Sequence, residues 1–372
     1  MGAYIFRRLL LIIPTLIAIM AINFIVVQAA PGGPIEQVIA NLTGQGSDIT
    51  SRVTQGGTGE NLGSSAKNVG VGIGSSSNSK YRGAQGLDPE FIEQLEKQFG
   101  FDKPLLTRFW DMLKNYATFD FGESFFQDRK VIELVADKMP VSISLGLWTT
   151  LLVYLISIPL GIIKAMRDGS RFDIWTSVAI VIGTAIPGFL FAVLLLVVFA
   201  GGSYVDWFPL GGLASENAGE MGTFERIIDY FWHLVLPVTA MTIGGFATLT
   251  MLTKNSFLDQ INQQYVLTAR AKGLAEKRVM LGHVFRNAML IVIAGFPAAF
   301  IGILFTGSLL IEVIFNLDGL GLLGFEAAFK RDYPVMFGTL FFFSLLGLIM
   351  NLIGDVTYTL VDPRIDFEGQ DG

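Results

Sequence analysis

The sequence predicts an all-α protein that crosses a membrane several times, and three observations support this prediction. Of the 372 residues, 52% are hydrophobic and only 16% are charged, whereas a soluble domain carries roughly 25% charged residues. Several nearly uncharged runs are longer than the ~18 residues that a spanning helix needs. Lysine and arginine residues gather in alternate connecting segments, which is typical of loops that lie on opposite sides of a membrane.

Six apolar segments are predicted to be spans. The first follows Arg7 and Arg8, and this basic pair places the N-terminus in the cytoplasm. Its length of about 20 residues and the lack of a small-residue cleavage site favour a retained helix over a removed signal peptide. Pro140 is expected to open the second span, and Pro187-Gly188 to kink the third. The spans are expected at residues 9–29, 141–163, 174–200, 232–252, 290–311 and 335–360.

A long insertion separates the first two spans. Residues 41–86 are crowded with Gly, Ser, Asn and Thr and show no periodicity, so a flexible loop is expected there. In residues 87–140, Asp88 is an N-cap followed by Pro89 at the first helical position, and Gly100 closes the helix. The predicted divisions are the N-terminus with the first helix (1–30), the insertion outside the cytoplasm (31–140), a core of five spans (141–361) and a tail (362–372).

The basic residues predict that both termini lie in the cytoplasm. Only Arg226, Lys330 and Arg331 fall in the two short loops assigned to the outer side. The cytoplasmic side then holds Arg7, Arg8, Lys164, Arg167, Arg171, Lys254 and the basic residues between the fourth and fifth spans. This arrangement satisfies the positive-inside rule.

The loop between the fourth and fifth spans, residues 253–289, is the most informative stretch. Tyr265 to Lys272 consists of good helix formers, and Gly273 can take the left-handed conformation that ends a helix. A second helical pattern runs from Leu274 to Leu290. The sequence thus predicts a short basic helical elbow against a membrane. Ala269 and Gly273, four residues apart, are predicted to share a face that a partner approaches closely.

Four polar residues in or beside the spans are candidates for a transport pathway, and each has a plainer alternative. Asn23 and Gln28 lie in the first span, where a hydrogen bond to a neighbouring helix is the alternative. Glu312 follows the fifth span, and a carboxylate at a helix end near the interface is the alternative there. Asp355 lies near the inner end of the sixth span, where an acid marks function or a partner pairing.

The absence of several motifs restricts the function. The sequence contains no G-x-x-x-x-G-K-[ST], no H-E-x-x-H and no G-x-S-x-G, so it indicates no ATP site of its own and no hydrolase. With no Cys and two His, no metal site is expected either. The span centres hold almost no acids or bases, whereas a proton-coupled carrier needs a relay of them. Energy is therefore expected to enter from outside the bilayer. A transporter or channel that works alone and a membrane-embedded enzyme are the alternatives.

The loop sequence Y-V-L-T-A-R-A-K-G-L-A-E-K-R-V from Tyr265, followed by H-V-F-R-N-A from His283, carries a family resemblance. It resembles the cytoplasmic signature loop of ABC importer permeases, in the version found in peptide transporters. Two positions depart from the family pattern. Leu267 stands where the general signature has Glu, and Ile291 stands where a Pro is usual, so the next helix is expected to be less kinked.

Segments outside this loop extend the resemblance to residues 1–40 and 81–365. They include G-F-D-K-P from Gly100, D-F-G-E-S from Asp120 and R-D-Y-P from Arg331. The inserted Gly/Ser loop resembles the Yej-type branch of this family, whose members import oligopeptides and take up microcin C. The resemblance implies a type I permease fold with six transmembrane helices and a periplasmic cap inserted after the first, in a bacterial inner membrane.

The same resemblance implies the partners and the mechanism. The partners would be a second permease subunit, an ATPase subunit with two nucleotide-binding domains that binds ATP and Mg²⁺, and a periplasmic binding protein. Transport would proceed by alternating access, with no cofactor on this chain, no catalytic residues and no nucleic-acid partner. Coupling to the ATPase would involve Tyr265, Ala269, Arg270, Ala271, Lys272, Gly273 and Glu276.

Overall fold

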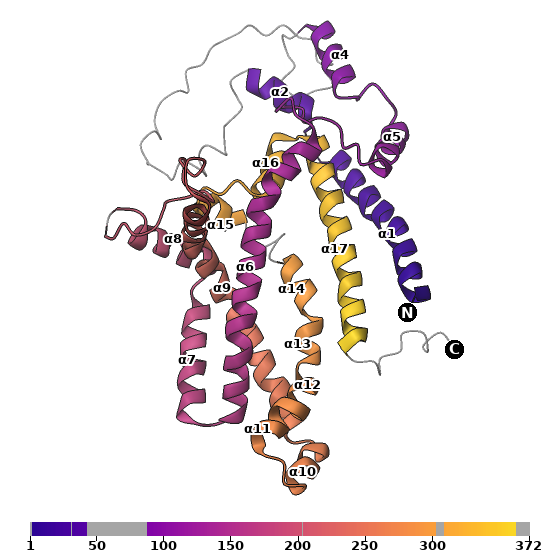
Figure 1. Ribbon diagram of the computed structural model, residues 1–372. Coiled ribbons are helices and arrows are strands. Elements are labelled where there is room, and N and C mark those ends of the chain that lie inside the picture. Colours follow the sequence, from indigo (N-terminus) through magenta and orange to yellow (C-terminus); the bar gives the residue numbers. More distant parts are fainter. Residues whose placement is uncertain (1, 31, 43–87, 203, 303–308, 362–372) are drawn as a thin grey trace. The chain divides into compact units, whose positions relative to one another are not determined.

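The computed structural model describes residues 2–30, 32–42, 88–202, 204–302 and 309–361, and its regular structure is helical (Figure 1). The predicted flexible stretch lies outside the described residues from position 43 onward, as does the predicted tail. The helices are α1 (Gly2–Ala29), α2 (Pro34–Leu42), α4 (Pro89–Gln98), α5 (Leu105–Ala117), α6 (Val131–Met166), α7 (Arg171–Ala185), α8 (Gly188–Phe199), α9 (Thr223–Ile261), α10 (Gln264–Ala271), α11 (Glu276–Val279), a π-helix (Met280–Val284), α12 (Phe285–Ala288), α13 (Leu290–Ala294), α14 (Phe296–Gly302), α15 (Leu309–Ile314), α16 (Leu320–Lys330) and α17 (Tyr333–Val361).

Four described helices are long and apolar enough to cross a membrane, namely α1, α6, α9 and α17. They correspond to the predicted first, second, fourth and sixth spans. The predicted start of the second span was wrong, because Pro140 lies inside α6, which begins at Val131. The hydroxyl of Ser144 donates to the Pro140 carbonyl at 2.6 Å, so a side chain hydrogen-bonds the backbone in this turn of the helix.

The predicted third span is divided into α7 and α8, which meet at an angle of 88°. The break falls at Pro187, as predicted, but it is far larger than a kink. Ile186 is extended with ψ 120°, because the residue before a proline avoids the helical region. Pro187 then begins α8 by accepting from the amide of Leu190 at 2.9 Å. The pair is either one broken span or a re-entrant segment.

The predicted fifth span, residues 290–311, has no single helix in the described part of the chain. It is distributed over α13, α14 and α15, and residues 303–308 between them lie outside the described residues. Met289 and Gly295, which separate α12, α13 and α14, keep helical backbone angles, and their amides donate to the Phe285 and Ile291 carbonyls at 2.9 and 3.1 Å.

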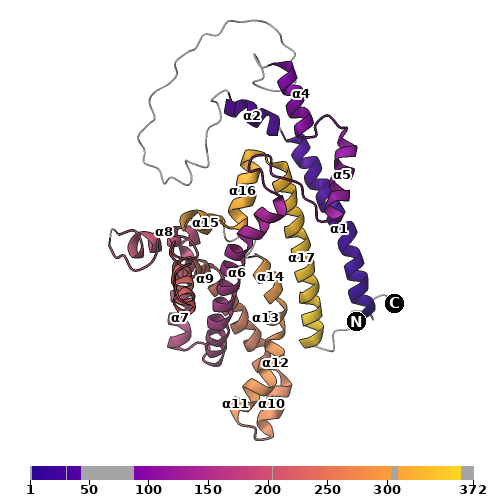
Figure 2. The same cartoon turned by 45° about the horizontal axis from the view of Figure 1, so that its top comes forward.

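The chain forms two compact units. The first comprises Met1–Ile13, Lys138–Leu322 and Phe343–Gly372. Its helices α6 and α9 approach closely at Gly161 of α6, because glycine has no side chain. An added Cβ there would lie 2.6 Å from the Cβ of Thr253. In both views of this unit, α10, α11 and α12 gather at the end of α9 opposite to α15 (Figures 1 and 2).

The second unit comprises Pro14–Asp137 and Leu323–Phe342. The predicted helix start is confirmed, since the Asp88 side chain accepts from the Glu90 amide and Pro89 occupies the first turn of α4. Gly100 takes φ +71° after this helix, as predicted. The small core between α2 and α4 contains Ile35, Ile39, Leu95 and Phe99.

Candidate functional site

The elbow, defined here as Gln264–Ala288, begins as the sequence predicts. α10 ends at Ala271, and Gly273 has φ +78°. The Leu274 amide donates to the Ala269 carbonyl at 3.3 Å, and the Gly273 amide donates to the Arg270 carbonyl at 2.9 Å. These two bonds form the Schellman arrangement, in which a left-handed glycine satisfies the last carbonyls of a helix. The chain therefore leaves α10 at a defined angle.

The second half of the elbow is less regular than predicted. The helical pattern predicted from Leu274 to Leu290 is present from Glu276 to Ala288, but it includes a π-helical turn. The structure has the short helix α11, the π-helix Met280–Val284 and the short helix α12. A π-helix shifts the side chains that follow it relative to a regular helix, and such bulges are frequent at functional sites.

An ion pair joins the two arms of the elbow. Arg270 on α10 donates through Nε and Nη2 to both carboxylate oxygens of Glu276, at 3.1 and 2.6 Å. The hydrogen bonds from Arg270 lower the pKa of the Glu276 carboxyl, and those to Glu276 raise the pKa of the guanidinium. Because both side chains are exposed, the pair contributes little to stability, about 0–1 kcal/mol. Its two-pronged geometry instead orients α10 relative to α11.

Ala269 does not lie on an exposed face, so that prediction was wrong. It is 6% exposed and packs in one buried cluster with Val266, Val279, Met280 and Val284. The elbow needs this small apolar core because its arms are too short to persist as isolated helices. Gly273 has open space beside it, and its role is to end α10.

The exposed face of α10 is the opposite one. Gln264, Leu267, Thr268 and Ala271 are all exposed, and their spacing of three and four residues places them on one side of the helix. Leu267, at the position that departs from the family signature, is 57% exposed. Sequence reasoning placed Ala271 among the coupling residues but missed Leu267, since one exposed leucine is not informative without the burial pattern. Lys272 is also exposed and borders this face.

The elbow is attached firmly to α9. The Ser256 hydroxyl donates to the Ala288 carbonyl at 2.6 Å, and the Tyr265 hydroxyl donates to Gln260 Oε1 at 2.8 Å. The ring of Phe257, which is 1% exposed, meets Phe285 edge-on at a centroid distance of 6.1 Å. A displacement of the elbow would therefore move the end of α9 with it.

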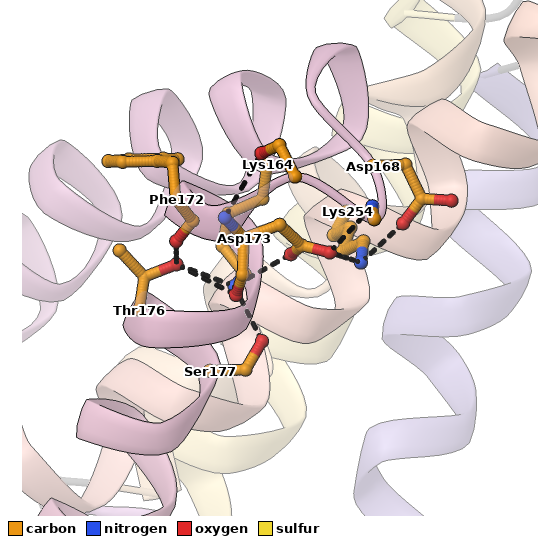
Figure 3. Close-up of polar contacts among 9 residues, drawn as sticks. Lys164, Asp168, Phe172, Asp173, Thr176, Ser177 and Lys254 are labelled. Carbon is orange, nitrogen blue, oxygen red and sulfur yellow. Dashed lines mark hydrogen bonds and ion pairs between the residues drawn. The ribbon is translucent and has the colours of Figure 1, made fainter.

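A buried polar cluster connects α6, α7 and α9 (Figure 3). The Lys164 ammonium is fully buried and contacts Asp173 at 2.9 Å, Thr176 at 2.8 Å and Ser177 at 2.7 Å. Lys254 of α9 pairs with Asp173 at 2.8 Å and with Asp168 at 2.7 Å. Asp173 thus holds two ammonium groups from two helices. Because buried charges are stable only when paired, the cluster fixes the α6–α7 turn against α9.

Glu312 is enclosed, which corrects its prediction as a pathway residue. Its carboxylate is 0% exposed, accepts from the Leu322 amide at 2.7 Å and from the Ser142 hydroxyl at 3.3 Å. An added Cβ at Gly319 would lie 2.4 Å from this carboxylate. The glycine-rich segment after α15 therefore folds around Glu312 and holds it as a structural anchor.

The other three pathway candidates have structural surroundings as well. Asp355 of α17 pairs with Arg8 of α1 at 3.2 Å and accepts from the Tyr4 hydroxyl at 3.2 Å. The Oε1 atom of Gln28 accepts from the Arg108 guanidinium at 3.0 Å, which is the predicted alternative of a bond to a neighbouring helix. Asn23 is half-buried in the same helix. The described residues contain no group of three or more His, Asp or Glu side chains that could hold a metal ion.

The fold and the elbow define a class of protein. Four described helices are long and apolar enough to cross a membrane, and a basic elbow lies between α9 and α13. The sequence contains no phosphate-binding loop. This is the design of a transport subunit that receives energy from another protein. The chain belongs to the family of binding-protein-dependent transport system inner membrane components, whose model matches residues 157–367. It is therefore a permease subunit of an ABC transporter, and its relatives are permeases rather than enzymes.

Similar proteins cover the entire chain. It is 62% identical over 371 residues to the peptidoglycan transport system permease protein YejB of Agrobacterium fabrum, with 100% of each chain covered. It is 59% identical over 370 residues to the inner membrane ABC transporter permease protein YejB of Escherichia coli O157:H7, again with 100% of each covered. The oligopeptide transport system permease protein AppB of Bacillus subtilis is 33% identical over 375 residues, which cover 99% of this chain and 100% of AppB.

A solved structure of the MetNI methionine ABC transporter in an inward-facing conformation also matches, at 14% identity and a TM-score of 0.46. The match covers 62% of this chain and 97% of that one.

Proposed function

We propose that this chain carries oligopeptides across the bacterial inner membrane, from periplasm to cytoplasm, as one of two permease subunits in an ATP-driven importer. The observation that carries this proposal is the elbow, an exposed helix fixed by a glycine-ended turn, an ion pair and a core shared with α9. A helix that is rigid and attached to a spanning helix can transmit the motion of a docked ATPase. The peptide substrate is supported by relatives named for oligopeptide transport.

The proposed docking face consists of the exposed side of α10 and the residues that border its glycine turn. Leu267 and Ala271 supply a low, apolar surface, and Lys272 supplies charge at its edge. Tyr265, Arg270 and Glu276 act from within by holding α10 in place. Ala269 contributes through the elbow's core. The elbow and both termini are proposed to lie in the cytoplasm, which agrees with the distribution of Lys and Arg.

The proposed complex contains a second permease of the YejE type, an ATPase of the YejF type with two nucleotide-binding domains, and a periplasmic binding protein of the YejA type. ATP and Mg²⁺ would bind to the ATPase. Closure of the ATPase domains would displace the elbow, and α9 would carry this displacement into the membrane. Microcin C is proposed as a further substrate of the complex. One similar permease is named for peptidoglycan transport, so peptides derived from peptidoglycan belong in the same test.

The test is uptake of labelled peptide into liposomes supplied with the three partner proteins, with this chain present or omitted. Uptake that requires this chain, ATP and the binding protein together supports the proposal. If the chain alone moves solute down a gradient or with protons, it is a transporter of another kind and the elbow is not a coupling element.

The docking assignment has its own test in Gly273→Trp. The bulky side chain would project from the turn beside the proposed docking face, where the structure has open space. This variant is expected to insert into the membrane normally but to transport little peptide for each ATP hydrolysed. Normal uptake per ATP would refute the docking face while leaving the transport function intact.

A further inference from the structure

Helix α5 of the second unit carries an apolar stripe, defined here as Leu106, Trp110, Leu113 and Ala117. Leu106 is 82% exposed and Trp110 is 71% exposed, while Leu113 is half-buried and Ala117 is exposed. Their spacing of four, three and four residues places all of them on one side of the helix. Because a helix in water directs its polar residues outward, an exposed stripe of this kind marks a contact with a partner or a membrane.

The other sides of α5 have their contacts within the chain. Phe109 packs against Phe24 of α1 at a centroid distance of 5.3 Å, and Tyr116 on the same side is buried. On the polar side, the Asp111 carboxylate pairs with the Lys103 ammonium at 2.7 Å. At 100° per residue, the apolar stripe lies between this packed side and this polar side. It is therefore the part of the helix's apolar surface that the chain itself leaves exposed.

Contacts with α1 set the depth of the stripe relative to a bilayer. The Arg108 guanidinium donates to Oε1 of Gln28, the next-to-last residue of α1, at 3.0 Å. Phe24, which Phe109 contacts, lies one turn further inward. Because α1 is long and apolar enough to cross a membrane, its last turns lie where a span leaves the hydrocarbon. In both views α5 lies beside the end of α1 that is remote from the N-terminus (Figures 1 and 2).

The exposed side chains of α1 at this level are apolar. Ile25 and Val26 each leave more than half of their surface exposed, and they lie within about 5 Å of Phe24 and Gln28 along the helix axis, since the rise is about 1.5 Å per residue. Apolar side chains on the outside of a spanning helix contact lipid. The stripe of α5 is thus held at a depth where acyl chains begin.

The residues of the stripe and its border suit this boundary. The indole ring of Trp110 is apolar and carries one N–H donor, which is why tryptophan is enriched where hydrocarbon meets headgroups. Lys114, exposed four residues after Trp110, places an ammonium group beside the stripe, where lipid phosphates lie. An apolar stripe with a tryptophan and a neighbouring basic residue is typical of a helix that lies in the membrane interface.

From these observations we infer that α5 lies in the surface of the bilayer, with Leu106 and Trp110 among the upper acyl chains, and anchors the insertion between α1 and α6 to lipid. With the proposed orientation, this is the periplasmic leaflet. The contact with lipid does not depend on what the complex transports, so a failure of the proposed substrate would leave it intact.

The first test measures whether the stripe is withdrawn from water. The chain has no cysteine, so Leu106→Cys and Thr107→Cys each introduce a single thiol. Thr107 is the matched control, because it is the next residue and is exposed on the polar side. The complete complex in lipid nanodiscs is treated with a charged, water-soluble thiol reagent. We expect Leu106→Cys to react at least about fivefold more slowly than Thr107→Cys, because an apolar environment disfavours both the thiolate and the reagent.

The second test identifies what covers the stripe. The same two thiols are labelled with a small uncharged fluorophore and exposed to lipids that carry a nitroxide high on the acyl chain, or to iodide in the water. The nitroxide lipid should quench the Leu106 probe at least about threefold more than the Thr107 probe, and iodide should show the reverse order. Trp110→Cys and Lys114→Cys form a second pair with the same expected difference. ATP hydrolysis by each labelled complex reports that the complex is assembled.

Equal reaction rates of Leu106→Cys and Thr107→Cys would show that the stripe faces water and would overturn the inference. Slow reaction of Leu106→Cys without quenching by the nitroxide lipid would show that a protein covers the stripe, which also overturns it. Both tests are repeated without the binding protein. Protection of Leu106→Cys that appears only when the binding protein is present would assign the stripe to that partner instead of lipid.

Discussion

The hydroxyl of Ser124 donates a hydrogen bond to the carboxylate of Asp332, 208 residues away in the chain. Asp332 is 3% exposed and also accepts from the Phe125 amide at 3.2 Å. The same Ser124 oxygen accepts from the amide of Gln127 at 3.0 Å. Two segments that resemble family motifs, D-F-G-E-S and R-D-Y-P, thus form one polar junction in the second unit.

Removal of the Ser124 hydroxyl is predicted to destabilise the protein in a pH-dependent way. Burial raises the pKa of Asp332, and the bond from Ser124 opposes this rise. Since the folded pKa exceeds the unfolded one, the folded state binds more protons between the two values, and stability falls as pH rises through the folded pKa. Ser124→Ala raises the pKa of Asp332 further. We expect a loss of about 1–3 kcal/mol at neutral pH.

The measurement for Ser124→Ala is the melting temperature of the detergent-purified protein between pH 4 and pH 8. The difference from wild type should shrink toward acid pH, where Asp332 becomes neutral in both proteins. Ser144→Ala is the control, because the Ser144 hydroxyl bonds a carbonyl of its own helix. A deficit that is constant with pH would show that Asp332 is not the group responsible.

Gly273→Ala is predicted to strain the elbow through its backbone alone. The residue has φ +78° and no atom within 4 Å of an added Cβ, so the cost of roughly 1–2 kcal/mol comes from the left-handed conformation. Gly273→Asn should cost less, since Asn tolerates this region. Uptake per ATP should be highest for the wild type, lower for Gly273→Asn and lowest for Gly273→Ala. Gly282→Ala, also with open space but without positive φ, should behave as wild type; equal effects at both glycines would contradict this explanation.

Lys254→Met is predicted to loosen α9 from the α6–α7 turn. The variant leaves Asp168 without this ammonium and Asp173 with Lys164 alone. Removing one partner of a buried ion pair is costly, and because Asp173 keeps a second cation we expect a loss of roughly 2 kcal/mol. The melting temperature reports it, with the exposed Lys277→Met as the matched control. Indistinguishable melting of both variants would mean that the cluster does not hold these helices together.

Gly161→Ala is predicted to force α6 and α9 apart. The new methyl group would lie 2.6 Å from Thr253 Cβ and 2.8 Å from the Thr250 carbonyl oxygen, and overpacking of this kind costs about 1–3 kcal/mol. Gly183→Ala on α7 meets no atom within 4 Å and should be neutral or slightly stabilising, because Ala favours helices. The melting temperatures of the two variants test the contact. Similar values would show that the helices accommodate the methyl group.

The sequence by itself determined most of the architecture. Long apolar runs specify spanning helices because a chain in lipid must satisfy its own backbone polar groups. The Asp88-Pro89 start of α4 and the Gly273 end of α10 were predictable for a related reason, since caps depend on residues adjacent in sequence. The elbow could also be recognised from the sequence, because its residues form one continuous stretch.

Only the tertiary structure decided which side chains are free and which are enclosed. Ala269 was predicted on an exposed face but lies in a core, and Glu312 was predicted beside a pathway but is covered by the Gly319 segment. The junction of Ser124 with Asp332 had no local signal in the sequence. Local patterns specify helices and their ends, whereas burial and polar pairing depend on which distant segments pack together, and that information is distributed over the entire chain.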